Sequence, residues 1–200
     1  MENKPTKKLK KTGLFFGSFN PIHIGHMAII NYMVEFSDLA EVWLVVSPHN
    51  PLKERKSLLP DYHRLALVHL AIEDDPRFRA IDLEFHMPRP SYTIDTLVRL
   101  EEKYPDRKFV LIAGTDVLPT FHKWKNYKLL LENYQIYIYN RPNYDPGPYS
   151  SHPGIRFFDA PLMEVSSTFI RNAARRGKDV RHFMPEKVAK YVREMHFYEK

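Results

Sequence analysis

The stretch Gly17-Ser18-Phe19-Asn20-Pro21-Ile22-His23-Ile24-Gly25-His26 decides the fold of this 200-residue chain. It follows an apolar run at 12–16 that predicts a buried strand, and it leads into residues 27–34, whose pattern predicts a helix. A strand, a turn of small residues and a helix start place free backbone N–H groups and the positive end of a helix dipole at one point. This point is predicted to bind phosphate.

The two histidines of this stretch are the first candidates for chemistry. His23 and His26 are three residues apart, so at a helix start they share a face and can reach two oxygens of one polyphosphate. Gly17 is expected to let the backbone approach a ligand closely, and Gly25 to leave room beside the first helical turn. Two alternatives stay open. The histidines could be half of a metal site, although the segment has no cysteine or carboxylate at ligand spacing, or they could cap the helix and carry no chemistry.

Composition limits the class of protein. The length and the 44% hydrophobic content fit one domain over 12–200, preceded by a flexible basic tail over 1–11. The absence of cysteine excludes disulfides, thiolate catalysis and cysteine-based zinc sites, and it agrees with a reducing compartment. The N-terminal residues lack the apolar core of a secretory signal, and no apolar run is long enough to cross a membrane. We therefore expect a cytoplasmic protein with no membrane partner.

The charge of the chain is +6, which suits nucleic acid, an anionic membrane surface or small polyanionic substrates. The N-terminal lysines are interpreted as a solvated tail. Other basic residues fall in predicted loops or near the C-terminus, namely Lys53, Arg55, Lys56, Arg171, Arg175, Arg176, Lys178 and Arg181. Basic loops that follow strands favour a triphosphate as the anion.

Apolar strand patterns alternate with helical patterns along the chain. Strands are predicted at 12–16, 41–46, 79–85, 108–113, 135–139 and 156–158, and helices at 61–72 with Asp61 as cap, 93–103 and 127–133, with more helix near the C-terminus. Residues 142–153 read as a surface loop. The alternation predicts an α/β fold, a Rossmann-like doubly wound parallel sheet with helices on both faces. Ligands of such sheets bind outside the carboxyl ends of the strands.

A second candidate phosphate site lies near the C-terminus, at Val165-Ser166-Ser167-Thr168-Phe169-Ile170-Arg171. Ser166 or Ser167 can cap the following helix, and Arg171 lies one turn further along the same face. The forked guanidinium of arginine suits triphosphate oxygens. Taken alone, the segment could equally be an ordinary N-cap with a surface arginine.

Two segments between these motifs are candidates for a second substrate. The turn around Tyr92 and Thr93 offers an aromatic ring, a hydroxyl and free helix-start N–H groups, which could seat a flat ring that bears a carboxylate. Trp124 stands in a polar, apparently exposed setting from which it could stack on a ring. The alternative for Trp124 is a packing role between helices.

These motifs together resemble the nucleotidylyltransferase superfamily, whose signature is a strand, a Gly-Ser/Thr-Phe-Asp/Asn-Pro turn and a His-x-Gly-His helix start, followed later by Ser-Ser-Thr-x-x-Arg. The segments 91–97, 113–118, 121–124, 140–142 and 183–188 narrow the resemblance to the bacterial nicotinate-nucleotide adenylyltransferases. The similarity covers nearly the whole chain beyond the lysine tail. Asn20 stands where the family more often has aspartate, which removes one charge from the turn.

The resemblance implies a set of site residues. His23, His26 and Arg171 are the catalytic candidates, with His26 at the α-phosphate and His23 orienting the triphosphate. The candidates for binding ATP and its phosphates are Gly17, Ser18, Phe19, Asn20, Lys53, Gly114, Asp116, Ser167 and Thr168. The candidates for the nicotinate ring are Tyr92, Thr93 and Trp124. Mg²⁺ is expected to arrive with ATP, held by phosphate and water, with no metal site of the protein's own.

The family resemblance implies transfer of AMP from ATP to nicotinate mononucleotide, which yields deamido-NAD and pyrophosphate. Nicotinamide mononucleotide and phosphopantetheine are the alternative acceptors. A module that binds nucleotides or nucleic acid without catalysis is a further alternative, supported by the basic charge, but it leaves His26 and the Ser-Ser-Thr-x-x-Arg motif unexplained. Nucleic acid is therefore not the expected partner, and the formation of a homo-oligomer stays open.

Overall fold

The computed structural model describes residues 9–48, 58–161 and 163–199. In these ranges the strands are β1 Lys10–Gly17, β2 Glu41–Val46, β3 Phe78–Ile81, β4 Arg107–Gly114, β5 Gln135–Tyr139 and β6 Ile155–Phe158. The α-helices are α1 Ile24–Phe36, α2 Asp61–Ile72, α3 Thr93–Lys103, α4 Tyr127–Asn133, α5 Ser167–Arg175 and α6 Glu186–Glu194. The 3₁₀ helices are η2 Leu83–His86, η3 Thr115–Lys123, η4 Gly147–Tyr149 and η5 Arg181–Phe183.

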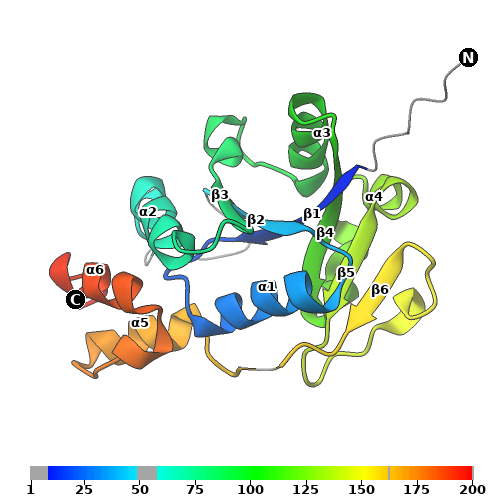
Figure 1. Cartoon of the computed structure of the whole chain (residues 1–200). Helices are drawn as coiled ribbons and strands as arrows, with labels where there is room; N and C mark the ends of the chain where they lie inside the picture. Colours follow the sequence, from blue (N-terminus) through cyan, green and yellow to red (C-terminus); the bar gives the residue numbers. More distant parts are fainter. Residues whose placement is uncertain (1–8, 49–57, 162, 200) are drawn as a thin grey trace, which may run out of the picture.

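The six strands form one sheet in the order β3-β2-β1-β4-β5-β6, and every neighbouring pair is parallel (Figure 1). This is the strand order of the Rossmann-type doubly wound fold, so the predicted fold class is confirmed. The order of the strands reverses between β1 and β4. The carboxyl ends of these two strands, at Gly17 and Gly114, therefore flank the crevice in which such folds bind their ligands.

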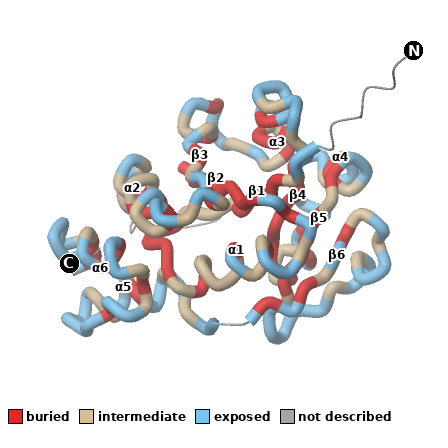
Figure 2. The backbone as a smooth tube through the Cα atoms, viewed as in Figure 1, coloured by how far each residue is buried: buried red, intermediate tan, exposed pale blue. Residues whose placement is uncertain are grey.

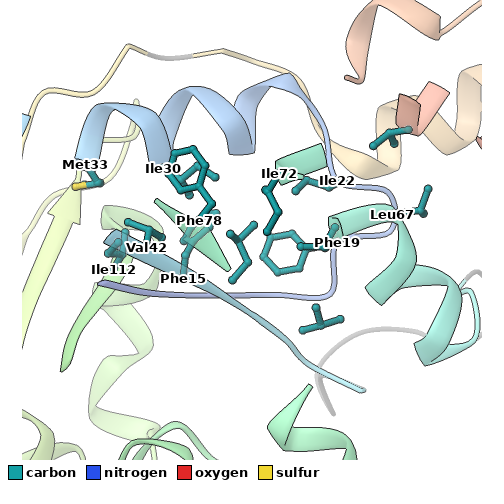
Figure 3. Packing of buried hydrophobic residues seen from close by; sticks show 14 of the residues in the cluster. Phe15, Phe19, Ile22, Ile30, Met33, Val42, Leu67, Ile72, Phe78 and Ile112 are labelled. Carbon is teal, nitrogen blue, oxygen red and sulfur yellow. The ribbon is translucent and has the colours of Figure 1, made fainter. Parts of the chain in front are cut away.

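Helices cover both faces of the sheet, because successive residues of each strand point to opposite sides. Phe15 of β1 joins a buried cluster with α1, α2, α5 and α6, whereas Leu14 joins a second cluster with α3, α4 and η3. Figure 3 shows the first cluster, in which Ile30 and Met33 of α1 lie over the sheet. The strands themselves form the buried centre of the molecule (Figure 2). Each fully buried aliphatic side chain of this kind contributes about 1.5–3 kcal/mol.

Several predicted boundaries differ from the structure, by one to three residues at α1, β4 and β6, and three differences concern the roles of named residues or elements. Strand β1 begins at Lys10, so Lys10 and Lys11 belong to the sheet rather than to a tail, and they pair with Glu41 and Asp38. The strand predicted over 79–85 ends at Ile81, because β2 pairs only four of its residues with β3 and the chain then turns into η2. Asp61 is the first residue of α2 rather than its cap, a position held by Pro60.

The remaining strongly patterned elements agree with the prediction. Strands β2 and β5 and helices α2, α3 and α4 have the predicted bounds. The loop over 142–153 is largely exposed and contains the short helix η4. In the part of the chain that the structure describes, no helix has the length and apolar character needed to cross a membrane.

Candidate active site

The turn after β1 is built around a buried phenylalanine. Phe19 is 1% exposed, has a positive φ of 45°, and packs its ring 5.2 Å from His26. A Cβ at Gly17 would lie 2.8 Å from this ring, so the small residue there makes room for Phe19. This differs from the predicted reason, which was the close approach of a ligand. Phe19 can therefore offer phosphate only its backbone.

Helix α1 starts at the paired histidines. His23 is the N-cap, and its carbonyl accepts the N–H groups of His26 and Met27. The two imidazole rings stack with their centroids 3.7 Å apart. The backbone N–H of His23 donates to Nδ1 of His26 at 3.2 Å, which places the proton of a neutral His26 ring on Nε2. His26 therefore presents an N–H donor away from this bond.

His23 is neutral at physiological pH. Burial, reinforced by the nearby charge of Arg141, lowers the pKa of His23 to about 4. A Cβ at Gly25 would stand 3.1 Å from Nδ1 of His23, so Gly25 leaves room for this ring in particular. His23 is thus a neutral hydrogen-bonding group that its neighbours hold in place.

Arg141 is a cation of the site to which the sequence analysis gave no role, although the segment 140–142 is part of the family resemblance. It lies two residues after the end of β5, its backbone N–H donates to Oγ1 of Thr115 at 2.8 Å, and its Nε lies 3.3 Å from Oδ1 of Asp116. Asp116 in turn fills the space above Gly114, where a Cβ would lie only 2.3 Å from Oδ1. The sequence signal for Arg141 was an arginine two residues after a predicted strand of a parallel sheet, because ligands of such sheets bind at the carboxyl ends of the strands.

The second predicted phosphate motif meets the first in space. Ser166 caps α5 by accepting the N–H of Phe169, which decides between the two predicted caps. Ser167 donates to the carbonyl of Pro21 at 2.9 Å, and Arg171 donates to the carbonyl of Asn20 at 2.8 Å. Segments about 150 residues apart in the sequence therefore form one site beside His23 and His26.

Thr168 and Arg171 lie on the same face of α5. Thr168 accepts a hydrogen bond from Nη2 of Arg171 at 3.3 Å, which orients both groups at the start of α5. Burial lowers the pKa of Arg171, yet the guanidinium stays charged at any physiological pH. The N-terminus of α5 thus combines free N–H groups, hydroxyls and one cation, the combination that suits phosphate.

Asn20 is 3% exposed, and its side chain has a structural role. Its Oδ1 accepts the backbone N–H of Leu59 at 3.2 Å and the hydroxyl of Tyr198 at 2.8 Å. The predicted hydrogen-bonding function of Asn20 is therefore directed at the protein, and both of these donors suit an amide oxygen as well as a carboxylate.

A fully buried arginine braces the same turn. The guanidinium of Arg64 donates to the carbonyl oxygens of Ser18, Ser47, Pro48 and Leu59 at 2.6–3.0 Å, and to Asp61 at 2.6 Å. All five of its donors are thereby used. The ends of β1 and β2 are joined through this one side chain. Ser18, one of the phosphate-binding candidates, accepts one of these hydrogen bonds with its backbone oxygen.

The predicted acceptor segments also lie close together. Tyr92 is the N-cap of α3, is 40% exposed, and is followed by Thr93 as the first helical residue. Nζ of Lys125 lies 4.8 Å from the centre of the Tyr92 ring and 2.8 Å from the carboxylate of Asp95. The residue after Trp124 is therefore held against the Tyr92 turn. A flat anionic ring would meet an aromatic face and the positive end of α3 there.

Trp124 is less exposed than predicted. It is half-buried, and its ring packs 5.2 Å from that of Phe121 in the second core cluster. Part of the Trp124 ring therefore has the packing role that was the alternative prediction, because Phe121 of η3 lies against it. Lys53 lies outside the described residues. Among the residues described, no three histidine, cysteine or acidic side chains gather as a metal site.

Comparison with known proteins identifies the family. A family model described as cytidylyltransferase-like matches residues 14–173. A probable nicotinate-nucleotide adenylyltransferase of Flavobacterium johnsoniae is 50% identical over 95% of this chain and 100% of its own length. The protein of the same name from Bacteroides fragilis is 50% identical over 91% of this chain and 90% of its own length.

The fold comparison agrees. The nicotinic acid mononucleotide adenylyltransferase of Plasmodium falciparum, solved in complex with NaAD, superposes with a TM-score of 0.81 at 20% identity, over 95% of this chain and 98% of that one. At 20% identity this similarity supports the fold alone. The family follows from the sequence comparison: at about half identity over more than nine-tenths of its length, the chain belongs to the nicotinate-nucleotide adenylyltransferase family.

Proposed function

We propose that this protein transfers AMP from ATP to nicotinate mononucleotide and releases pyrophosphate. The observation that carries the proposal is the meeting of the His23–His26 turn with the N-terminus of α5 at the carboxyl edge of the sheet. A phosphate oxygen of the mononucleotide attacks the α-phosphorus of ATP. The bond from that phosphorus to the bridging oxygen breaks, and the electron pair leaves with pyrophosphate.

The chain needs no general base for this step, because the attacking phosphate is already ionised at neutral pH. Catalysis then depends on positioning and on stabilising the charge that develops in the transition state. His26 donates from Nε2 to the α-phosphate, and the neutral His23 orients the triphosphate. Ser167, Thr168 and Arg171 stabilise the leaving pyrophosphate, and we assign Lys53 to the same group.

The remaining candidates shape the substrate pockets. Gly114 and Asp116 line the nucleotide side, and Arg141 adds a cation between Asp116 and His23. Tyr92, Thr93 and Trp124 seat the pyridine ring and its carboxylate beside the N-terminus of α3.

Magnesium enters as part of the substrate. ATP phosphates and water would hold the ion, as Mg²⁺ is commonly bound with nucleotide substrates, and the ion would neutralise phosphate charge. We place the reaction in the cytoplasm, where ATP and pyridine nucleotides are available.

The test is pyrophosphate release from Mg-ATP with nicotinate mononucleotide, nicotinamide mononucleotide and phosphopantetheine compared in parallel. The proposal expects the highest kcat/KM with the nicotinate acceptor. A preference for either other acceptor would retain the chemistry and overturn the assignment of Tyr92, Thr93 and Trp124. No release with any acceptor would favour a nucleotide-binding module. Sedimentation of the same preparation gives the oligomeric state.

A further inference from the structure

A separate cavity lies in the C-terminal part of the fold. It has a volume of about 960 Å³, opens to solvent, and is lined by the C-terminal half of α5, η5, α6 and the segment that follows α6. This volume is at the upper end of the range for small-molecule sites. None of the active-site candidates lines it. In Figure 1, α5 and α6 lie side by side next to the C-terminus.

The floor of the cavity is apolar. Val180, Met184 and Val192 are each less than 10% exposed, and Phe197 is half-buried. Phe197 is anchored from behind by ring contacts with His63 and Tyr191, at centroid distances of 4.7 and 5.8 Å. Such a floor accepts a flat, weakly polar body.

The rim carries an excess of positive charge. Its charged residues are Arg175, Lys178, Arg181, Lys190 and Arg193 against Asp179, Glu186 and Glu199, with His182 in addition. Arg181 is paired with Asp179, Lys190 lies 3.9 Å from Glu194, and Glu199 bonds to His196.

Three rim cations remain without a counter-ion. In the part of the chain that the structure describes, Arg175, Lys178 and Arg193 form no ion pair. Among the rim acids described, Glu186 alone forms none. Unpaired cations around an apolar floor attract an anion that also has an apolar body.

We propose that this cavity is a second ligand site, which binds a small organic anion of the nucleotide class. The ring would lie on the floor near Met184 and Phe197, and the phosphate would face Lys178 and Arg193. A long polyanion is disfavoured because the apolar part of the surface lies inside the hollow. The site borders the active site through α5, which carries Arg171 in its middle and Arg175 at its end.

Methionine methyl NMR of the whole protein tests this proposal, with AMP as the probe. Met184 lines the cavity, whereas the carbonyl of Met163 lies 3.6 Å from where a Cβ of Gly25 would be, beside the active site. The two methyl signals therefore report the two sites separately, and Met184→Leu assigns the first with little change of volume. We expect the Met184 methyl signal to shift saturably as AMP is added, at a midpoint concentration different from that of the Met163 signal.

Charge variants decide whether the rim binds the probe. The double variant Lys178→Glu, Arg193→Glu should weaken the Met184 response at least tenfold. Arg176→Glu is the matched control, because this exposed cation lies in the same segment but outside the cavity, and it should leave the response unchanged.

Several results would overturn the proposal. One is a Met184 signal that does not move up to millimolar AMP, and another is a response that the double variant leaves intact. A third is a stronger response to a single-stranded oligonucleotide that Arg176→Glu also weakens, because the surface would then bind nucleic acid. None of these results bears on AMP transfer, which pyrophosphate release measures independently.

Discussion

The paired histidines show how single residues carry the proposed chemistry. Because Nδ1 of His26 accepts from the backbone of His23, the proton of the neutral ring lies on Nε2, the atom that the proposed function assigns to the α-phosphate. Replacing His26 by alanine should lower kcat about 10²-fold, the usual effect of removing one donor to a developing oxyanion. The free energy of unfolding should fall by about 1–3 kcal/mol, because the hydrogen bond from the backbone of His23 and the ring contacts with His23 and Phe19 are lost.

Steady-state pyrophosphate release and urea unfolding of the same samples check this expectation. His69→Ala is the matched control, since His69 is an exposed histidine on α2. Undiminished turnover of His26→Ala would remove His26 from the catalytic assignment.

The buried state of His23 predicts a dependence of stability on pH. Burial lowers its pKa from 6.5 to about 4, so between these values the unfolded chain binds more protons than the folded protein. The free energy of unfolding should therefore fall as pH falls from 6.5 to 4, by about 3 kcal/mol for this residue at 1.36 kcal/mol per pH unit.

Urea unfolding at several pH values measures this contribution. His23→Gln lacks the titrating group, so its stability should fall less steeply than that of the wild type over the same interval. Carboxylates such as Asp38 and Asp75 titrate in both proteins and cancel in the difference. Parallel stability curves would show that folding does not lower the pKa of His23.

Motifs indicated candidate site residues but not the direction of their side chains. Phe19 and Asn20 stand in the predicted phosphate turn, yet one fills the core and the other bonds to Leu59 and Tyr198. These contacts come from residues 39 and 178 positions away, which no local pattern contains. Arg141 was missed for the same reason, because its relation to His23 exists only after β5 is placed in the sheet.

At the scale of elements, periodicity predicted the helices and central strands well. Residues 93–103 show a regular apolar face, and α3 has these bounds. The error at β3 arose from pairing, because the apolar pattern continues to Phe85 while the pairing of β3 with β2 ends at Ile81 and Val45, and the chain then turns into η2. The arrangement of elements at the site depends on one side chain that sequence reasoning treated only as part of a helix, Arg64.

Arg64 predicts how tightly the ends of two strands are coupled. Lysine at position 64 keeps the charge but offers three donors in place of five, so buried carbonyls lose partners at about 1–3 kcal/mol each. Arg64→Lys should therefore lower the free energy of unfolding by about 2–5 kcal/mol and reduce kcat/KM, since the carbonyls of Ser18 and Ser47 are released at the ends of β1 and β2.

Urea unfolding and assays at a temperature where the variant is folded measure both effects. Arg79→Lys is the matched control, because Arg79 is exposed and rests on the ring of Trp43 at 5.0 Å. It should cost less than about 1 kcal/mol. Equal costs for the two variants would refute the bracing role of Arg64.

At the scale of the whole molecule, the C-terminal segment returns to the turn that opens the fold. Tyr198 is 8% exposed, and its hydroxyl donates to Oδ1 of Asn20, whose backbone oxygen accepts from Arg171. The segment after α6 and helix α5 therefore contact the same residue of the turn after β1, which forms one side of the candidate phosphate site. Sequence motifs could not predict this closure, because no signal in the segment after α6 points to Asn20.

Two tyrosine variants distinguish an effect of the Tyr198–Asn20 contact on ATP binding from an effect on the stability of the whole protein. Tyr198→Phe and Tyr191→Phe each remove one hydroxyl hydrogen bond, to Asn20 at 2.8 Å and to Nδ1 of His63 at 3.0 Å, so each should cost about 1 kcal/mol. Only Tyr198→Phe should also raise the KM for ATP several-fold, because it alone loosens the turn that meets α5. Pyrophosphate assays at varied ATP, with urea unfolding of both variants, measure the contrast. If both variants raised the KM for ATP equally, the C-terminal segment would act through general stability rather than through Asn20.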